Sequence, residues 1–340
     1  MNKVITLGEI MLRLSTEGNL RFSQANHFNT NYGGGEYNVA VSLANYGLKA
    51  EFVSRLPDNE LGYNCLAEMR KNRVGNSHIL MEGNRLGLYY LEIGAGCRSS
   101  QVIYDRAGSA FSEITPGMID WKMVFNDASW FHWSGVTPAV SQSAAEACLE
   151  AVQVASKMGL TISTDLNYRS KLWKYGKEPK EIMPDLLQYS DVILGDLNTA
   201  FFMLGENSLI PDYQTPDSLP ELYDRVFEHC SNLKQMITCL RYSVNASHQR
   251  IGGILYDGEK IHTAEVRDVT PVIDRVGSGD AFMGGLVYGL ISAPENKQHA
   301  LDLAVAACCL KHTIPGDVNL STLGELEKMT AGDVSGKVVR

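Results

Sequence analysis

The sequence predicts an α/β fold: a three-layer sandwich with a central, mostly parallel sheet and a small antiparallel β lid. Short apolar segments alternate along the chain with segments of helical periodicity, which is typical of a parallel sheet covered by helices. The 340 residues, 44% of them hydrophobic, suffice for one large core. Two stretches, 9–32 and 85–111, break the alternation and carry strand-like patterns without a helix between them.

The predicted elements follow one another in order. The first buried strand is 4–8, an apolar run that ends in glycine. A helix over 37–46 follows and is closed by Gly47, because glycine is favourable just after a helix end. The next strand is 50–56; later strands are predicted at 129–135, 160–166, 191–195 and 235–240, with helices that include 141–157 and 219–230. In such sheets, ligands bind on loops at the carboxyl ends of the strands.

The stretches 9–32 and 85–111 are predicted to form one small sheet that is inserted in a single domain spanning residues 1–340. LGLYYLEIG and SSQVIYDRAGSA have the alternation of paired antiparallel strands. Because successive strand side chains point to opposite faces, only one of Tyr89 and Tyr90 can easily face a pocket, and we choose Tyr89. The expected uses of this sheet are a lid, a contact between two copies of the chain, or both.

Composition excludes several classes of function. The 30 Lys and Arg against 39 Asp and Glu give a net charge of −9, which argues against a general binder of nucleic acid or of anionic membranes. No apolar run approaches the roughly 18 residues of a transmembrane helix, and the N-terminus lacks a signal-peptide pattern. The seven cysteines are scattered without CxxC spacing, and the His residues form no ligand pair. We therefore expect a cytoplasmic protein with no disulfide framework and no metal site built from such ligands.

The strongest motif is Asp274-Arg-Val-Gly-Ser-Gly-Asp-Ala-Phe282, which precedes a helical pattern. Gly277 and Gly279 permit backbone conformations that other residues avoid, so the turn places Asp280 in the first turn of a helix. The free N–H groups of residues 277–280, together with the helix dipole, favour an anion such as a transferring phosphate. A carboxylate at that point can take a proton from a hydroxyl. Spacing alone does not distinguish this from a tight turn that begins a helix.

A second motif is Gly33-Gly34-Gly35-Glu36-Tyr37-Asn38, again before a helix. Glycines at this point let a ligand approach the backbone closely, and the Asn38 amide can bind sugar hydroxyls or hold the turn. Taken alone, the pattern is equally typical of a flexible glycine turn.

Together, the two motifs resemble the signatures of the ribokinase/PfkB carbohydrate kinase family in order and separation, and the resemblance spans nearly the whole chain. The first family signature is Gly-Gly…Asn-x-Ala, and the second is Asp-Thr-x-Gly-Ala-Gly-Asp-x-Phe. The sequence contains neither a GxxxxGK[ST] P-loop nor a GxGxxG fingerprint. The resemblance implies a ribokinase-like fold, ATP as phosphoryl donor, Asp280 as general base, and an anion hole at Gly277, Ser278 and Gly279.

Within that family, the chain resembles the 2-keto-3-deoxygluconate kinases. GLYYLE (87–92), VIYDRAGSA (102–110), SGVTPA (134–139), DLNYRSKLW (165–173) and CLKHTIPGDVN (309–319) carry this resemblance. It implies a set of substrate-binding residues: Gly34, Asn38, Tyr89, Tyr104, Arg106, Arg169 and Asp317. A guanidinium binds a carboxylate through paired hydrogen bonds, so Arg106 and Arg169 suit a sugar acid better than a neutral sugar. The alternative for each arginine alone is a surface ion pair.

The nucleotide side is expected near Leu240–Ser243, the turn at Gly258 and a helix over 299–313. The family usually has a glycine-rich loop here, whereas TCLRYSVNASHQRIGG is predicted to be a longer polar loop. The residues assigned to the nucleotide by resemblance are Asn167, Asp196, Arg241 and Gly258.

Two positions depart from the family pattern. Arg275 stands where the second signature has Thr. The family's Asn-x-x-Glu motif, which helps to organise Mg²⁺ and phosphate, corresponds to Asp196-Leu-Asn-Thr199, so one carboxylate is replaced by Thr199. Mg²⁺ is still expected because ATP phosphates recruit it; a monovalent cation is left open.

The expected activity is ATP-dependent phosphorylation of a sugar-acid hydroxyl, first of all conversion of 2-keto-3-deoxygluconate to its 6-phosphate. One alternative is a kinase of the same family that acts on fructose or a related sugar. The other is a ribokinase-like binding or regulatory protein that has lost turnover. The resemblance also implies a homo-oligomer formed through the β lid.

Overall fold

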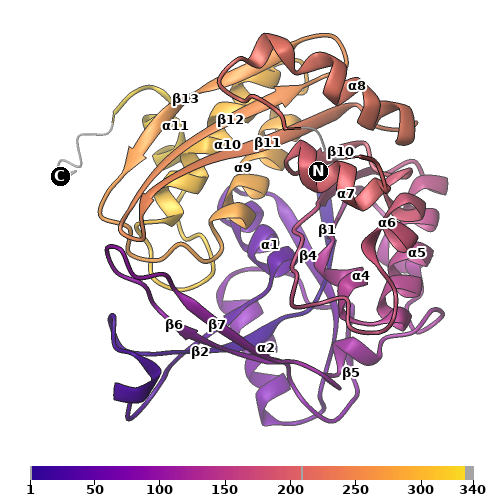
Figure 1. Cartoon of the computed structure of the whole chain (residues 1–340). Helices are drawn as coiled ribbons and strands as arrows, with labels where there is room; N and C mark the ends of the chain where they lie inside the picture. Colours follow the sequence, from indigo (N-terminus) through magenta and orange to yellow (C-terminus); the bar gives the residue numbers. More distant parts are fainter. Residues whose placement is uncertain (1, 208–209, 334–340) are drawn as a thin grey trace.

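The computed structural model describes residues 2–207 and 210–333 and contains a nine-stranded sheet (Figure 1). Its strand order is β5-β4-β1-β8-β9-β10-β11-β12-β13. Strands β5 to β11 of this order run parallel, and β12 and β13 add antiparallel at one edge. The bounds are β1 Lys3–Leu7, β4 Lys49–Leu56, β5 Ile79–Met81, β8 Ala128–Ser134, β9 Thr161–Asp165, β10 Val192–Leu194, β11 Gln235–Asn245, β12 His248–Tyr256 and β13 Ile261–Val269.

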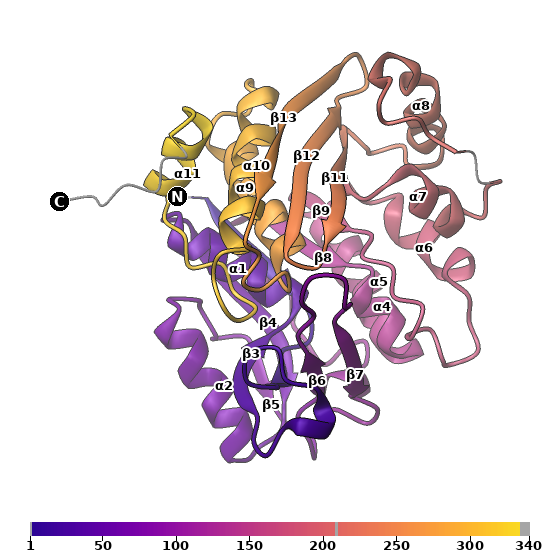
Figure 2. The ribbon, with the colours of Figure 1, turned by 60° about the vertical axis from the view of Figure 1, so that its left-hand side comes forward.

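Two hydrophobic cores lie on opposite faces of this sheet. Side chains alternate between them along each strand: Phe131 and Trp133 of β8 enter one core, while Trp130 enters the other. Figure 2 shows helices on both sides of the strands. One layer contains α1 Gly35–Asn45, α2 Glu60–Lys71, α9 Ser278–Ser292, α10 Lys297–Lys311 and α11 Leu323–Thr330; the other contains α3 Trp121–Val124, α4 Val136–Val140, α5 Gln142–Lys157, α6 Pro179–Leu187, α7 Leu197–Leu204 and α8 Pro220–His229. The predicted three-layer sandwich is confirmed.

A separate four-stranded sheet, called here the small sheet, is formed by the two stretches that break the alternation. It contains β2 Met11–Ser15, β3 Asn29–Gly33, β6 Leu88–Glu92 and β7 Gln101–Asp105, in the order β3-β2-β6-β7 (Figure 2). The pairs β2–β3 and β6–β7 are antiparallel, as predicted for the second pair, whereas β2 and β6 run parallel.

The predicted strands and helices of the main sheet agree with the structure to within a few residues. One prediction about the chain after residue 240 is wrong: TCLRYSVNASHQRIGG is not a polar loop but the hairpin of β11 and β12. Its polar residues form ladder pairs such as Tyr242 with Arg250 at the sheet edge, where side chains of residues 243–245 reach solvent. The polar composition of this segment is therefore due to its exposure at the sheet edge and does not indicate an irregular backbone. Among the described helices, none has the length and apolar character needed to cross a membrane.

Candidate active site

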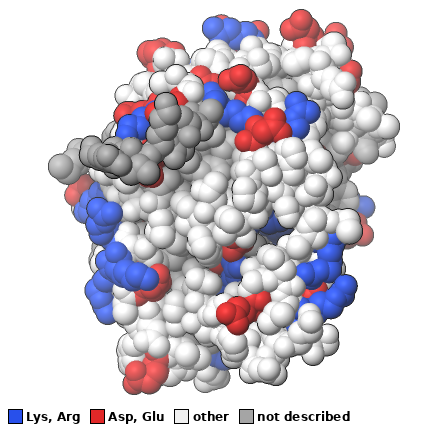
Figure 3. Space-filling model, turned by 90° about the vertical axis from the view of Figure 1, so that its left-hand side faces the viewer, with Lys and Arg blue, Asp and Glu red and all other residues white. Residues whose placement is uncertain are grey.

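A cavity of about 610 Å³ lies between the small sheet and the carboxyl ends of the central strands. On the face of the molecule shown in Figure 3, basic side chains lie within a hollow in a mostly uncharged surface. All predicted site residues except Gly258 line this cavity: Gly34, Asn38, Tyr89, Tyr104, Arg106, Asn167, Arg169, Asp196, Arg241, Gly277, Ser278, Gly279, Asp280 and Asp317. The fold thus brings residues from most of the chain's length to one place.

The start of α9 forms one wall of the cavity. Gly277 is the residue before the helix and has a left-handed φ of 79°, which favours glycine. A Cβ at this position would also collide with the carbonyl oxygen of Asp317. Asp280 lies in the first turn of the helix, as the motif predicted. Ser278 is buried, and its N–H donates to the Arg275 carbonyl at 3.3 Å. The prediction that the Ser278 N–H binds the anion is therefore corrected, because this N–H is already engaged. By helix geometry, the N–H groups of Gly277, Gly279 and Asp280 are those left to bind an anion.

The start of α1 meets the start of α9 across the cavity. The Asn38 side-chain amide donates to Asp280 Oδ2 at 2.7 Å. Gly34 precedes α1, and a Cβ there would collide with the backbone carbonyl of Glu9. A Cβ on Gly35 would lie 3.7 Å from both Asn167 Nδ2 and Asp280 Oδ1, so the bare glycine forms the floor between these two side chains. Burial raises the pKa of Asp280, and the Asn38 hydrogen bond opposes that rise.

The loops after β9 and β10 supply the polar groups at the carboxyl ends of the strands. Asp165 ends β9, and its Oδ1 accepts from the Asn167 N–H at 3.0 Å. The pKa of Asp165 is raised to about 7, chiefly by burial and also by the nearby Asp280 charge. Arg169 follows on the same loop and lines the cavity, and Asp196 begins α7 directly after β10. This placement matches the rule that ligands of α/β sheets bind at carboxyl strand ends.

The small sheet closes the opposite side of the cavity. Tyr89 and Tyr104 are paired across β6 and β7, and both line the cavity. Arg106 follows β7 and lies near the Tyr104 ring, with its guanidinium carbon 5.9 Å from the ring centre. Its Nε donates to Glu9 Oε2 at 2.7 Å, and its Nη2 contacts the same oxygen. Arg106 therefore already has a buried counter-ion, and among the described residues its Nη1 has no hydrogen-bond partner and is available to a ligand.

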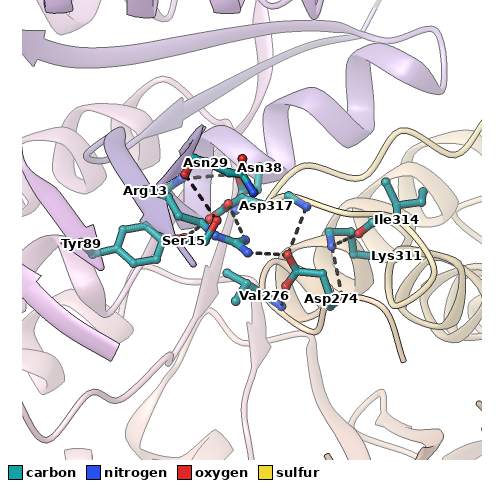
Figure 4. Close-up of polar contacts among 12 residues, drawn as sticks. Arg13, Ser15, Asn29, Asn38, Tyr89, Asp274, Val276, Lys311, Ile314 and Asp317 are labelled. Atoms are coloured by element: carbon teal, nitrogen blue, oxygen red, sulfur yellow. Dashed lines mark hydrogen bonds and ion pairs between the residues drawn. The ribbon is translucent and has the colours of Figure 1, made fainter. Parts of the chain in front are cut away.

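A buried ion cluster fixes the small sheet to the loops before α9 and after α10 (Figure 4). Arg13 of β2 donates to Asp274 at 2.6 Å and to Asp317 Oδ2 at 3.0 Å, and all three side chains are almost fully buried. The Tyr89 hydroxyl donates to Asp317 Oδ1. Both carboxylate oxygens of Asp317 are thus engaged by protein groups. Asp317 and Tyr89 are fixed in place by these contacts, and both line the cavity. Burial raises the pKa of Asp317, and Arg13 opposes that rise.

Arg241 projects into the cavity from the β11–β12 hairpin. Together with Arg169 and Arg275, it makes a group of three arginines that line the cavity without an ion-pair partner within 4.0 Å in the described part of the chain. Gly258 lies elsewhere, in the turn between β12 and β13, where Phe227 is its nearest side chain. Gly258 does not line this cavity, and its assignment to the nucleotide stays a prediction.

The residues present fit a magnesium ion that arrives with phosphates. No group of three or more His, Cys, Asp or Glu side chains is placed to hold a metal within residues 2–207 and 210–333. Asp165 and Asp196 nevertheless bring carboxylates to the cavity from neighbouring strands. Mg²⁺ is commonly held by one or two carboxylates together with substrate phosphates and water. Thr199 also lines the cavity, and its hydroxyl donates to Asp196 Oδ2 at 2.6 Å.

Four acidic or basic residues at or beside the site were given no role from the sequence: Glu9, Arg13, Glu36 and Asp165. Glu36 directly follows the second glycine motif and is fully buried, with the hydroxyls of Ser134 and Thr137 donating to its Oε1 at 2.6 and 3.0 Å. Burial raises the pKa of Glu36 to about 7. A usable signal was present, because Glu9, Arg13 and Asp165 each interrupt or end an apolar strand pattern, where a charged residue needs a partner.

Comparison with known proteins agrees with this geometry. The profile of the pfkB family carbohydrate kinases matches residues 1–322. A protein of Haloferax volcanii named 2-dehydro-3-deoxygalactonokinase is 31% identical over 334 residues, which cover 98% of each chain. A 2-dehydro-3-deoxygluconokinase of Thermoproteus tenax is 27% identical, covering 93% of this chain and 90% of that one.

Solved structures show the same fold. The crystal structure of a 2-dehydro-3-deoxygluconokinase from Thermotoga maritima superposes with a TM-score of 0.91, at 37% identity, covering 97% of this chain and 98% of that one. The family profile spans nearly all of the described residues, including both glycine turns and the cavity between them. The chain therefore belongs to the pfkB family of carbohydrate kinases.

Proposed function

We propose that the protein transfers the γ-phosphoryl group of ATP to a hydroxyl of a 2-keto-3-deoxy sugar acid, with 2-keto-3-deoxygluconate as the substrate and its 6-phosphate as the product. One observation carries the proposal: the Asp280 carboxylate lies at the N-terminus of α9 in the same cavity as three arginines without ion-pair partners in the described chain. A base, an anion hole and cations for a carboxylate are the groups that this reaction requires.

In the proposed mechanism, Asp280 takes the proton of the substrate hydroxyl. The hydroxyl oxygen forms a bond to the γ-phosphorus, and the bond from that phosphorus to the β,γ-bridging oxygen breaks with its electron pair left on ADP. The N–H groups of Gly277, Gly279 and Asp280 donate to the phosphoryl oxygens at the helix start. The raised pKa of Asp280 makes this carboxylate a stronger base than an exposed aspartate.

The acid group of the substrate is assigned to arginines. Arg169 has no ion-pair partner within the described residues and offers a full guanidinium edge, while Arg106 offers Nη1. Gly34, Asn38 and Tyr104 supply the remaining polar surface around the sugar. Fructose lacks the carboxylate for which these arginines are suited.

The nucleotide is assigned to the side of the cavity with Asn167, Asp196 and Arg241. Asp196 and Asp165 would hold Mg²⁺, which would neutralise negative charge that develops on the phosphates. A requirement for a monovalent cation rests on family resemblance alone.

The small sheet is proposed as a lid of a single domain and as the contact for a second copy of the chain. Its face away from the cavity carries Phe28 and Ile103, which are 38% and 54% exposed, and Tyr90, whose ring is 5.8 Å from that of Phe28. Closure over the cavity would exclude water from the phosphoryl group. Sedimentation of the wild type and of Ile103→Lys tests this contact: the wild type should be a dimer and the variant a monomer. A monomeric wild type contradicts it.

The cytoplasmic location is proposed from the thiols. All seven cysteines are free, and five of them are buried. This usage is typical of a reducing compartment.

The test of the function is release of ADP in the presence of Mg·ATP with 2-keto-3-deoxygluconate, gluconate, fructose and ribose. Turnover selective for the keto acid supports the proposal. Turnover of fructose or ribose retains the kinase chemistry and contradicts the carboxylate site, whereas no turnover with any of them contradicts the proposed function.

A second candidate substrate is 2-keto-3-deoxygalactonate, which differs from the gluconate form in the configuration of one hydroxyl. The observation in its favour is the 31% identity to the Haloferax volcanii kinase named for that sugar acid. Comparison of kcat/KM for the two epimers decides between them.

A further inference from the structure

An arginine from β11 lies directly on the glycine turn that begins α9. Arg241 Nη2 is 2.8 Å from the position that a Cβ on residue 279 would occupy. Gly279 has no positive φ in this structure, so the turn itself does not demand a glycine there. The absence of a side chain at 279 instead makes room for the guanidinium of Arg241.

This placement brings a cation to the positive end of a helix, where the Cys239 thiol and the Asp165 and Asp280 carboxylates are the nearby groups that favour its charge. The N-terminus of a helix carries a partial positive charge and repels a cation. Arg169 and Arg275 line the same cavity, and their charges lie close enough to Arg241 to lower the pKa of Arg275, together with the larger effect of burial. A chain that places like charges together usually does so at a functional site, where a ligand supplies the opposite charge.

The rest of the Arg241 side chain is held in place. Its Nε donates to Cys239 Sγ at 3.5 Å. The pKa of the Cys239 thiol is lowered to about 6, chiefly by a hydrogen bond with Cys308 of α10 and also by Arg241 itself. Neither Nη1 nor Nη2 of Arg241 has a hydrogen-bond partner in the part of the chain that the structure describes. The two free nitrogens therefore remain available to a ligand at the helix start.

We infer that Arg241 is a catalytic residue that donates from its Nη groups to the phosphoryl group in transfer, beside the N–H groups of Gly277 and Gly279. This inference rests on the proposed phosphoryl transfer and adds to it a cation supplied by the protein. Negative charge moves from the γ-phosphoryl oxygens to the β,γ-bridging oxygen as that bond breaks, and a guanidinium stabilises this redistribution.

The first experiment is steady-state kinetics of Arg241→Met and Arg241→Lys. An arginine that acts on the transition state contributes to kcat, so we expect Arg241→Met to lower kcat by about 10³-fold with a much smaller change in KM for ATP. Arg241→Lys keeps the charge without the forked donors and should recover part of the loss. The matched control is Arg250→Met on the partner strand of the same hairpin, whose side chain faces Asp268 and should leave kcat unchanged.

A second experiment does not depend on the sugar acid. Calorimetry measures binding of Mg·ADP with and without aluminium fluoride, which mimics the phosphoryl group in transfer. We expect aluminium fluoride to tighten ADP binding by about 10²-fold in the wild type. Arg241→Met should lose this gain while binding ADP alone normally.

The two experiments separate the failure of this inference from the failure of the proposed function. A wild type that phosphorylates none of the sugar acids contradicts the function, and the aluminium fluoride measurement still decides the role of Arg241. Three results would each overturn the inference. Arg241→Met could keep the wild-type kcat, or it could weaken binding of ADP alone as much as it weakens binding of ADP with aluminium fluoride. The third is a wild type whose ADP binding does not respond to aluminium fluoride. Melting temperatures check that the variants fold.

Discussion

The Asn38 amide donates to Asp280 Oδ2 at 2.7 Å and so joins the first turns of two helices that are 242 residues apart in the sequence. Helices α1 and α9 pack closely below this contact, where a Cβ on Gly284 would collide with Ser42. The hydrogen bond fixes one carboxylate oxygen of Asp280. The other, Oδ1, has no hydrogen-bond partner among the described residues and lies on the cavity side near Gly35.

Asp280→Asn is expected to lower kcat by about 10²-fold or more, because an amide cannot accept the hydroxyl proton. The variant should melt within a degree or two of the wild type, since an amide is isosteric with the carboxylate. Steady-state turnover with Mg·ATP measures the effect. Asn38→Ala is the companion variant: it keeps the base and should lose less activity than Asp280→Asn. Wild-type kcat in Asp280→Asn would rule out Asp280 as the base.

Arg169→Ala is expected to raise KM for a keto-acid substrate by about tenfold or more, which corresponds to loss of one charge-assisted hydrogen-bonded pair. KM for any neutral sugar that the enzyme accepts should hardly change. Stability should also hardly change, because the Arg169 side chain is exposed and has no ion-pair partner in the described chain. Equal increases in KM for acid and neutral sugars would remove the carboxylate role.

Substitution of Arg106, unlike that of Arg169, is expected to destabilise the fold, because the Arg106 guanidinium is buried against Glu9. Arg106→Met leaves the Glu9 carboxylate buried without a counter-ion, and Glu9 Oε1 already lacks a hydrogen-bond partner in the described residues. We expect a loss of about 3–5 kcal/mol in the free energy of unfolding. Urea titration measures it, and the double variant Glu9→Gln with Arg106→Met should recover most of the loss. A double variant as unstable as the single one would show that packing, and not charge, dominates.

The layers of the fold and the position of Asp280 could be predicted from patterns of residues that are close together in the sequence. The alternation of apolar strands with helices gave the layers, and the turn at Gly277 delivered Asp280 to α9 as expected. The partners of Arg106 and Asp317 could not be predicted, because Glu9 and Arg13 reach them through strand pairing in the small sheet and through contacts across hundreds of residues. The hairpin after residue 240 was missed for a different reason: an edge strand with exposed side chains has the composition of a loop.

Glu36 carries a prediction about pH and stability. Its carboxyl group has a pKa of about 7 in the folded protein, chiefly because of burial, against roughly 4.3 in an unfolded chain. The folded state therefore holds the proton more tightly than the unfolded state. Its contribution to stability is fully present below about pH 4.3 and is lost as the pH rises through about 7.

The size of that loss follows from the difference between the two pKa values, and it approaches about 4 kcal/mol at alkaline pH. Glu36→Gln removes the titrating proton while keeping an oxygen that can accept from Ser134 and Thr137. The variant should match the wild type near pH 4 and melt at a higher temperature near pH 8. The exposed Glu146→Gln serves as control, and its melting temperature should not differ from that of the wild type in a pH-dependent way. If Glu36→Gln were instead equally destabilised at both pH values, Glu36 would be a buried carboxylate that the fold needs in its charged form.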